Sequence, residues 1–309
     1  DGNILFFFAN FGKSGYGRED IFYSIREKNG WSKPINIGST INTDGYEGFP
    51  SVSPDGKRLY FTREIIGKNV NDKQCYRIMV SEKGRNGKWK EPFELPPPIN
   101  FDCEKAPRIM ADSRTLVFSS IKKGGKGDFD LYKAVLQDNG TWSEPIPLEF
   151  INTKKSDLFV AISPCGDLMY FVSNGDIYTT PVPEELRPFK IATIQGFVVD
   201  SLTKAPISAK IVVKDRATGQ SVAVLDNNPS DGRFTALVPI TGEYELSVNL
   251  SEFFTKNILI AKDLYKTCEV ILQDFLLQKL PSVAATNSNI PNTTPKSIPS
   301  AISLDRKST

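Results

Sequence analysis

The chain has 309 residues with 38 basic and 36 acidic side chains, and a formal net charge of +2 gives no reason to expect a nucleic-acid partner. It contains no histidine, which excludes Ser-His-Asp and Cys-His catalysis and most zinc sites. The longest apolar runs, such as residues 4–9, are far shorter than the roughly 20 residues of a membrane-spanning helix.

The first part of the chain is an internal repeat of a turn followed by an aromatic strand. The copies read DGNILFFF from residue 1, SVSPDGKRLYF at 51–61, RIMADSRTLVF at 108–118 and AISPCGDLMYF at 161–171. The equivalent turn positions Asp1, Asp55, Asp112 and Cys165 are 54, 57 and 53 residues apart. Gly or Asn in such a turn tolerates the positive φ that returns the chain antiparallel.

Each copy then continues with further short β-rich runs. A strand of the type Asp-Ile-Tyr follows at 19–25, 73–80, 128–135 and 175–182. Three copies add an outer strand with Trp31, Trp89 or Trp142, a proline three residues later, and a closing Ile-Asn pair. Four short antiparallel strands in a unit that repeats at about this length predict the blades of a β-propeller.

The three tryptophans are interpreted as structural residues. An aromatic side chain can bury roughly 150–250 Å² between an outer strand and its neighbour. The proline that follows suits an edge strand, where a missing N–H breaks no ladder. A platform that stacks sugars or bases is the alternative interpretation.

Both ends of the array differ from the middle. Residue 1 is already at the turn, so the first unit lacks its innermost strand, and the fourth unit has three strands and no tryptophan. The propeller part is therefore assigned to residues 1–187, with about three and a half to four blades, and further blades are expected before residue 1.

A different pattern begins near residue 188. Alternating runs at 211–213, 221–225, 234–238 and 244–248, separated by turns every 8–12 residues, predict a small β-sandwich over 188–280. Residues 266–280 supply a last strand or two. Residues 281–309 are rich in Ser, Thr, Asn and Pro and contain no aromatic residue, which predicts a disordered tail or linker.

The four cysteines, Cys75, Cys103, Cys165 and Cys268, have no CxxC spacing, so a structural zinc site is not expected. They are either buried thiols, the preferred interpretation, or one or two disulfides whose pairing the sequence leaves open.

Acidic residues recur just before each innermost strand and are the candidate binding residues. Glu47, Glu104 and Asp157 each lie three residues before the aligned positions 50, 107 and 160, and Asp44 and Asp102 are nearby. At the mouth of a central channel they could form an arc that holds a cation or receives a partner's Lys or Arg. The interpretation that we favour is that each acid is a repeated structural clip, which accepts hydrogen bonds from backbone N–H groups or pairs with the next blade. No catalytic residue, metal or cofactor is predicted.

Two resemblances follow from these patterns. The order SPDGKRLYF, then DIY, over residues 1–187 resembles the PD40 or TolB-like β-propeller repeat. The segment from GFVVDSLTKAPISAKIVV to SDGRFTALVPITGEYELSV resembles the carboxypeptidase regulatory-like domain, a transthyretin-like sandwich. The matching positions of that domain are Gly196, Pro206, Asp231-Gly232, Phe234 and Tyr244.

A PD40 propeller followed by this sandwich is similar to Bacteroidetes envelope proteins of the PorE and OmpA-family type. The resemblance implies an all-β, non-enzymatic scaffold in the periplasm, associated with the outer membrane, with envelope or type IX secretion proteins as partners. Peptidoglycan would be bound only through a domain not present here. The alternatives are a glycan- or peptidoglycan-binding protein and a carboxylate-dependent glycan-active enzyme.

Overall fold

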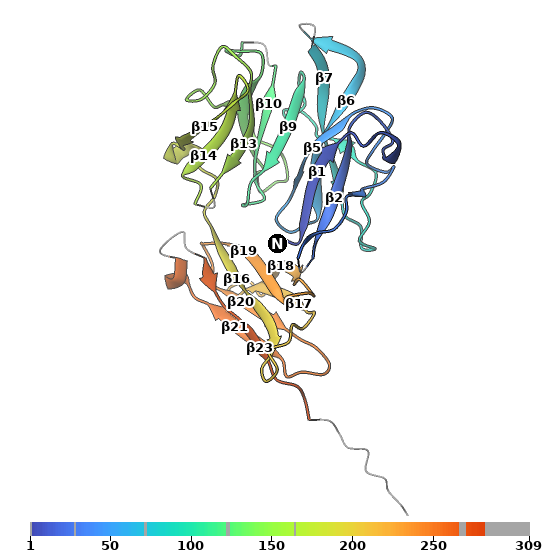
Figure 1. The fold of residues 1–309 in the computed structure, drawn as a ribbon. Coiled ribbons are helices and arrows are strands. Elements are labelled where there is room, and N and C mark those ends of the chain that lie inside the picture. The colour runs from blue at the N-terminus through green and yellow to red at the C-terminus, as the bar shows by residue number, and fades with distance from the viewer. Residues whose placement is uncertain are drawn as a thin grey trace, which may run out of the picture. The chain divides into compact units, whose positions relative to one another are not determined.

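The computed structural model describes residues 2–27, 29–70, 73–121, 124–163, 165–265 and 270–281 (Figure 1). Asp1, Cys268 and the predicted tail from residue 282 onward lie outside the described residues. The described chain consists of strands with three short 3₁₀ helices, so the expected all-β class is confirmed. Strands between residues 4 and 181 form four successive antiparallel sheets, and strands between 191 and 277 form two more.

The first sheet begins at the second strand of the repeat, as the sequence predicts. Its order is β1-β2-β3, and β4 also pairs with β2. The strands are β1 (Ile4–Ala9), β2 (Asp20–Glu27), β3 (Gly30–Trp31) and β4 (Ile35–Asn36), with the 3₁₀ helix η1 (Gly12–Ser14) between β1 and β2.

The second and third sheets are complete four-stranded meanders. The second comprises β5 (Glu47–Val52), β6 (Arg58–Val70), β7 (Lys73–Glu82) and β8 (Phe93–Glu94) in that order. The third comprises β9 (Glu104–Ile109), β10 (Thr115–Ser120), β11 (Asp130–Val135) and β12 (Ile146–Pro147). The outer strand differs from the prediction: Trp89 and Trp142 each form only an isolated bridge, and the regular pairing starts after the proline.

The fourth sheet has three strands and no outer strand, again as predicted. It comprises β13 (Asp157–Ile162), β14 (Leu168–Ser173) and β15 (Asp176–Pro181), followed by η2 (Glu184–Leu186). The turn that precedes the second strand of the repeat is built alike in all four sheets, including the first, where no described strand comes before it. Gly2, Gly56, Ser113 and Gly166 have φ of 76°, 68°, 58° and 73°, which confirms the predicted positive-φ turn.

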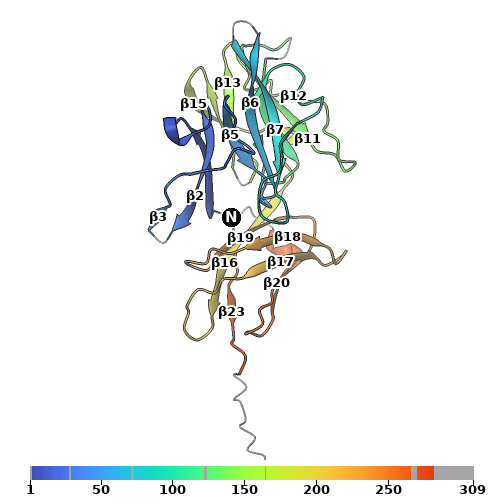
Figure 2. The same cartoon turned by 90° about the vertical axis from the view of Figure 1, so that its right-hand side faces the viewer.

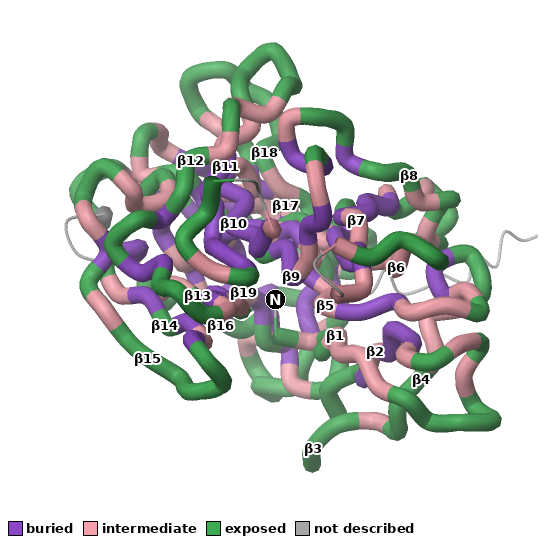
Figure 3. The backbone as a smooth tube through the Cα atoms, turned by 90° about the horizontal axis from the view of Figure 1, so that it is seen from above, coloured by how far each residue is buried: buried purple, intermediate pink, exposed green. Residues whose placement is uncertain are grey.

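Neighbouring sheets share clusters of buried apolar side chains, one for each pair of sheets. Leu59, Phe61 and Met79 of the second sheet join Ile21 of the first. Leu116, Phe118 and Tyr132 of the third join Tyr60 and Ile78 of the second, and a further cluster joins the third sheet to the fourth. Strand β10, at the centre of the array in Figure 3, is buried along its whole length. Burial of both faces of such short strands is what stabilises them.

The closing Ile-Asn pair fastens each of the first three sheets to the segment that leads to the next. The isoleucines Ile41, Ile99 and Ile151 are buried. Each asparagine accepts a hydrogen bond from a third-strand N–H and donates to the C=O of the same residue, at 2.8–3.0 Å. The pairs are Asn42 with Ile21, Asn100 with Ile78, and Asn152 with Leu131. This amide clip explains why the repeat keeps asparagine there.

The C-terminal strands form two four-stranded sheets that share one apolar cluster (Figure 2). One sheet comprises β16 (Ile191–Asp200), β19 (Arg233–Pro239), β22 (Ile271–Leu272) and β23 (Phe275–Leu277). The other comprises β17 (Lys210–Asp215), β18 (Ser221–Asp226), β20 (Tyr244–Val248) and β21 (Lys256–Ile260), with η3 (Lys262–Tyr265) after it. The four predicted runs lie in strands, and β22 and β23 lie in the segment predicted to supply a last strand or two, whereas β16 and β21 were not predicted.

Gly196 shows why the sequence pattern of this C-terminal part contains a glycine. A Cβ at Gly196 would lie 1.9 Å from the carbonyl oxygen of Gln273. Only glycine therefore lets β16 approach the segment that pairs with it in parallel. Across the described residues, no helix has the length and apolar character needed to cross a membrane.

Candidate interaction site at the inner strands

The three recurring acids occupy equivalent places in the structure. Glu47, Glu104 and Asp157 are the first residues of β5, β9 and β13, and all three are at most 1% exposed. A buried carboxylate must be paired or hydrogen-bonded to remain charged. Their partners therefore decide what these side chains can do.

Glu47 is held by the turn before it and by an arginine of its own sheet. Its Oε2 accepts the N–H of Thr43 at 2.7 Å, and its Oε1 accepts the Thr43 hydroxyl at 2.7 Å. The Nε of Arg63 donates to Oε1 at 2.9 Å, while Nη2 of the same arginine donates to the C=O of Ile41 at 2.7 Å. Both oxygens of this carboxylate are therefore engaged within the protein.

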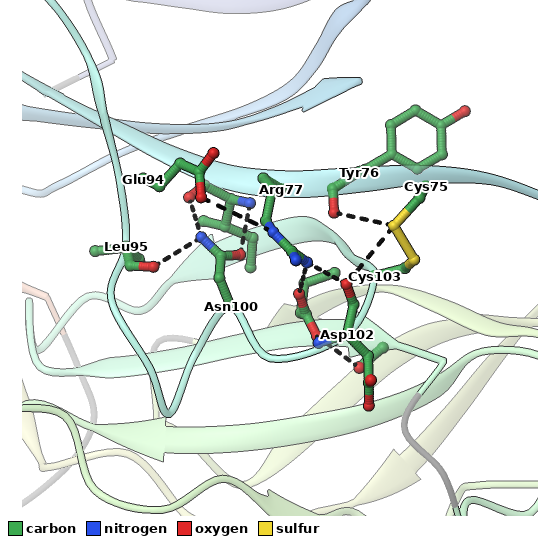
Figure 4. A network of polar contacts seen from close by, with 11 residues as sticks. Cys75, Tyr76, Arg77, Glu94, Leu95, Asn100, Asp102 and Cys103 are labelled. Carbon is green, nitrogen blue, oxygen red and sulfur yellow. Dashed lines mark hydrogen bonds and ion pairs between the residues drawn. A yellow bond between two sulfur atoms is a disulfide. The ribbon is translucent and has the colours of Figure 1, made fainter. Parts of the chain in front are cut away.

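Glu104 connects the second sheet to the third through Arg77, a residue that Figure 4 shows beside Asp102. Its Oε1 accepts the N–H of Asp102 at 2.7 Å and the hydroxyl of Ser120 at 3.1 Å, and Nη1 of Arg77 donates to its Oε2 at 3.0 Å. Arg77 also donates to the C=O of Asp102 and lies 3.9 Å from the Glu94 carboxylate. Burial raises the pKa of Glu104, and the hydrogen bonds and Arg77 oppose that rise.

Asp157 repeats the arrangement in the fourth sheet without an arginine. Its Oδ2 accepts the N–H of Thr153 at 2.6 Å, and the Thr153 hydroxyl lies 3.2 Å from both carboxylate oxygens. Asp44 is exposed, and Asp102 takes part through its backbone N–H and C=O. Within the described ranges no group of three or more carboxylates or thiols is arranged so that it could hold a metal ion.

These contacts are those of the structural clip. Each acid closes the connection between one sheet and the next. The backbone N–H groups of Glu47 and Asp157 donate to the carbonyls of Glu19 and Phe129, the residues just before β2 and β11, at 2.8 and 2.7 Å. These hydrogen bonds hold the inner strands in position. Because the three carboxylates are buried, any binding to this region must use other, exposed side chains.

A strained residue follows two positions after each acid. Phe49, Ala106 and Phe159 have φ of 54°, 53° and 50°, and the pairing register of all three inner strands shifts at this point. Positive φ is unusual for a bulky non-glycine residue. The β-bulge redirects the side chains at these positions.

The bulges bring aromatic rings from three sheets together in a central aromatic cluster, defined as Phe8, Tyr46, Phe49, Tyr76 and Phe159. The Phe49 ring lies 4.7 Å from the ring of Phe8 and 5.1 Å from that of Phe159, between centroids. Tyr46 lies 5.4 Å from Tyr76. Phe159 is still 40% exposed, so the cluster presents an apolar surface to solvent.

Lys105 extends this cluster with a charge. Its Nζ lies 3.9 Å from the ring centroid of Phe129 and 5.8 Å from that of Tyr76, which is cation–π geometry. Burial, together with the nearby charge of Lys73, lowers the pKa of Lys105 to about 8. The inner strands thus combine an exposed aromatic surface with a partly desolvated amine.

Replacing Lys105 by methionine is expected to raise the free energy of unfolding at pH 7 by about 1 kcal/mol, after discounting for partial exposure. The folded pKa lies below the value of 10.5 expected for the unfolded chain, so between about pH 8 and 10.5 the unfolded state binds more protons. The gain should therefore shrink as pH rises through that window. Urea unfolding at pH 7 and pH 10 measures it, and a gain independent of pH would contradict the prediction.

The state of the cysteines differs from the expected buried thiols. Cys75 on β7 and Cys103 at the start of the third sheet form a disulfide, so the preference for buried thiols is wrong for these two (Figure 4). Their burial was predicted, but the sequence spacing of 28 residues carries no signal that the repeat would place them side by side. Cys165 is partly exposed, and Cys268 lies outside the described residues.

The three tryptophans occupy equivalent positions in the repeat, but their side chains have different surroundings. Trp89 packs on the cluster between the first and second sheets, with its ring 6.4 Å from that of Phe6, and Trp142 packs on the cluster between the second and third. Trp31 is 45% exposed, because no described sheet precedes the first. Packing of the ring against the preceding sheet is thus seen for two of the three.

Sequence reasoning missed Arg77, Lys105 and the bulged aromatics. The sequence does mark Arg77 as unusual. It occupies the position before the apolar pair of the third strand, where the other three copies of the repeat have an aspartate: Asp20, Asp130 and Asp176. In the first and third sheets that aspartate caps a loop, accepting N–H bonds at 2.6–3.3 Å. The second sheet exchanges this loop cap for an ion pair with Glu104 in the next sheet.

No family profile matches the chain, and the comparison with curated proteins finds no match. Among solved structures, a protein assigned to TolB from Agrobacterium tumefaciens is 14% identical with a TM-score of 0.37, over 77% of this chain and 71% of that one. TolB from Acinetobacter baumannii is 12% identical with a TM-score of 0.36, over 84% of this chain and 61% of that one.

An α-L-arabinofuranosidase from Lactobacillus brevis is 14% identical with a TM-score of 0.36, over 58% of this chain and 68% of that one. At these scores the likeness assigns neither a family nor an activity to this chain.

Proposed function

We propose that this chain is a non-enzymatic protein-interaction scaffold of a bacterial envelope. In this proposal residues 1–187 are PD40-type propeller blades and residues 188–280 are a carboxypeptidase regulatory-like sandwich. The observation that carries it is the repeated architecture: successive antiparallel meanders pack through equivalent positions, and the same amide and carboxylate clips join them. Rigid repeats of this kind suit the presentation of a binding surface.

The disulfide supports the proposed location. Disulfides persist in oxidising compartments such as the bacterial periplasm and are rare in the cytosol. The bond between Cys75 and Cys103 joins two consecutive sheets, so it fits a protein that works after export. A periplasmic place at the outer membrane, with envelope or type IX secretion proteins as partners, is the setting that we propose.

The carboxylates support a scaffold over a carboxylate-dependent enzyme. A glycosidase needs one acid on each side of a substrate, with oxygens available to it. The buried Glu47, Glu104 and Asp157 instead accept hydrogen bonds from their own turns, and two of them also pair with arginines. They are therefore assigned an architectural role.

The binding surface that we propose is the central aromatic cluster with Lys105. Half-exposed aromatic rings are enriched where proteins bind each other, and Phe159 is held in this position by a strained backbone. Lys105 provides a cation that is partly stripped of water, which suits an acidic or carbonyl-rich segment of a partner. A glycan that stacks on the exposed ring is the second candidate, favoured by the same exposure of Phe159.

The test compares Phe159→Ser with Ile66→Ser, a control at a side chain on β6 that is 75% exposed. The immobilised wild-type chain should retain a protein from a Bacteroidetes envelope extract, and Phe159→Ser should reduce its binding at least tenfold while Ile66→Ser leaves it unchanged. Both variants should keep the melting temperature of the wild type. Titration with muropeptides runs in parallel.

Three results would contradict the proposal in different ways. Muropeptide binding that Phe159→Ser abolishes would replace it with the glycan-binding alternative. A partner that all variants retain equally would place the binding surface elsewhere. Glycan turnover by the wild type, lost in Glu104→Gln without loss of folding, would make the chain an enzyme.

A further inference from the structure

The junctions between successive sheets differ in how the charge of their buried inner acid is balanced. Between the first and second sheets the acid is Glu47, and its cross-strand neighbour on β6, Arg63, donates to it at 2.9 Å. Between the second and third sheets the acid is Glu104, and Arg77 donates to it at 3.0 Å. Each of these two carboxylates therefore has a guanidinium against it.

The junction between the third and fourth sheets has two buried acids and no arginine. Its inner acid is Asp157, and the cross-strand neighbour on β14 is Ser173, which stands where the second sheet has Arg63. The position of Arg77 is occupied by Asp130 in the third sheet. The two aspartates are 0% and 2% exposed, and among the described residues neither forms an ion pair with a lysine or an arginine.

The backbone brings Asp130 and Asp157 side by side. The N–H of Asp157 donates to the C=O of Phe129, the residue just before Asp130, at 2.7 Å. The loop that Asp130 caps lies equally close, since a Cβ at Gly127 would lie 2.0 Å from the carbonyl oxygen of Lys155. Burial raises the pKa of Asp130, two backbone N–H groups of its loop oppose that rise, and the nearby charge of Asp157 adds to it. The two negative charges therefore repel each other in a buried place.

One oxygen of Asp130 is buried without a hydrogen-bond partner. Its Oδ2 accepts two N–H groups of its own loop at 2.6 and 3.3 Å, whereas Oδ1 has no partner among the described residues. The equivalent Asp20 of the first sheet uses both oxygens, and it also receives the side-chain N–H of Asn36 at 2.9 Å. The third sheet has Pro147 in the register position of Asn36, and proline has no N–H to donate. A buried carboxylate oxygen is costly unless a donor or a cation satisfies it.

We propose that this junction binds one calcium ion, held between Oδ1 of Asp130 and the carboxylate of Asp157. Calcium takes oxygen ligands, carboxylates and water among them, in a flexible geometry. The two carboxylates balance its charge, so the ion does at this junction what Arg63 and Arg77 do at the other two. Two side chains are fewer than a complete cage, and water fills the remaining positions. The affinity should therefore be modest, with a Kd on the order of 10⁻⁴–10⁻³ M.

Thermal unfolding with and without calcium tests the site. After removal of bound metal with EDTA, calcium chloride at about 10 mM should raise the melting temperature of the wild type by several degrees, because an ion that binds only the folded state stabilises it. Sodium chloride at equal ionic strength should not. Asp130→Asn keeps the shape of the side chain and removes its charge, so the shift should be lost. Dialysis against radioactive calcium should find one ion per wild-type chain and none in this variant.

Asp20→Asn is the matched control, because it makes the same change in the first sheet, where Glu47 already has Arg63. This variant should keep the full calcium shift. Ser173→Arg is a second test that leaves Asp130 in place: it adds a guanidinium at the register position of Arg63, and calcium should no longer raise its melting temperature.

A wild type that neither binds calcium nor gains stability from it at about 10 mM would overturn the inference. A calcium shift that Asp130→Asn or Ser173→Arg retains in full would overturn it too, since the ion would then bind elsewhere. Loss of the shift in Asp20→Asn would have the same consequence.

Discussion

Replacing Asn100 by leucine is expected to lower the free energy of unfolding by about 2–5 kcal/mol. The Asn100 side chain accepts the N–H of Ile78 at 2.9 Å and donates to the C=O groups of Ile78 and Leu95, both at 2.8 Å. Leucine has the same branching at Cγ but is larger, and it can offer none of these bonds. The N–H of Ile78 and the C=O of Leu95 would lose these bonds, whereas the C=O of Ile78 keeps the N–H of Leu95 at 3.0 Å. Each buried group left unsatisfied costs about 1–3 kcal/mol.

Urea unfolding followed by circular dichroism measures this effect. Asn139→Ala is the control, because Asn139 lies in an exposed turn and its loss should cost under about 1 kcal/mol. Asn42→Leu and Asn152→Leu should resemble Asn100→Leu, since both asparagines make the same pair of bonds. If Asn100→Leu cost no more than Asn139→Ala, the amide clip would not be a source of stability.

The strand order of the first four sheets could be predicted because it is written in local patterns. Turn residues, alternating apolar positions and the order of the runs are sequence-local, and they recur at a fixed spacing. Even the missing inner strand of the first sheet and the missing outer strand of the fourth followed from the register of the repeat. In the C-terminal part β16 and β21 were not among the predicted runs. The five residues KNILI of β21 alternate weakly and follow an irregular turn.

The candidate site could be predicted only in part. The recurrence of Glu47, Glu104 and Asp157 was visible, and so was the possibility that they act as clips. Their hydrogen-bond partners were not, because Arg77 reaches Glu104 across 27 residues and from another sheet. The positive φ of Phe49 and Phe159 had no signal, because phenylalanine rarely adopts it. Contacts between sheets depend on how the copies stack, which a repeat pattern does not specify.

The second large effect concerns the disulfide. Replacing both Cys75 and Cys103 by alanine is expected to lower the free energy of unfolding by about 3–4 kcal/mol, the loop-closure term for a bond that spans 28 residues. The bond connects β7 to the segment that enters β9, beside the ion pair of Arg77 and Glu104. Its loss should therefore loosen the contact between the second and third sheets first, and hydrogen exchange should rise in β9 before it rises in β13.

Treatment with a reductant distinguishes the loss of the disulfide from other effects of the two alanine substitutions. Dithiothreitol should lower the melting temperature of the wild type by several degrees and leave the double alanine variant unchanged, because that variant has no bond to lose. Cys165→Ser should respond to reductant like the wild type, since Cys165 is not part of this bond. Alkylation of the native protein followed by peptide mapping should leave Cys75 and Cys103 unmodified until reductant is added. Should reductant shift the wild type and the double variant equally, the stability would come from elsewhere, and the argument for an oxidising compartment would lose its support.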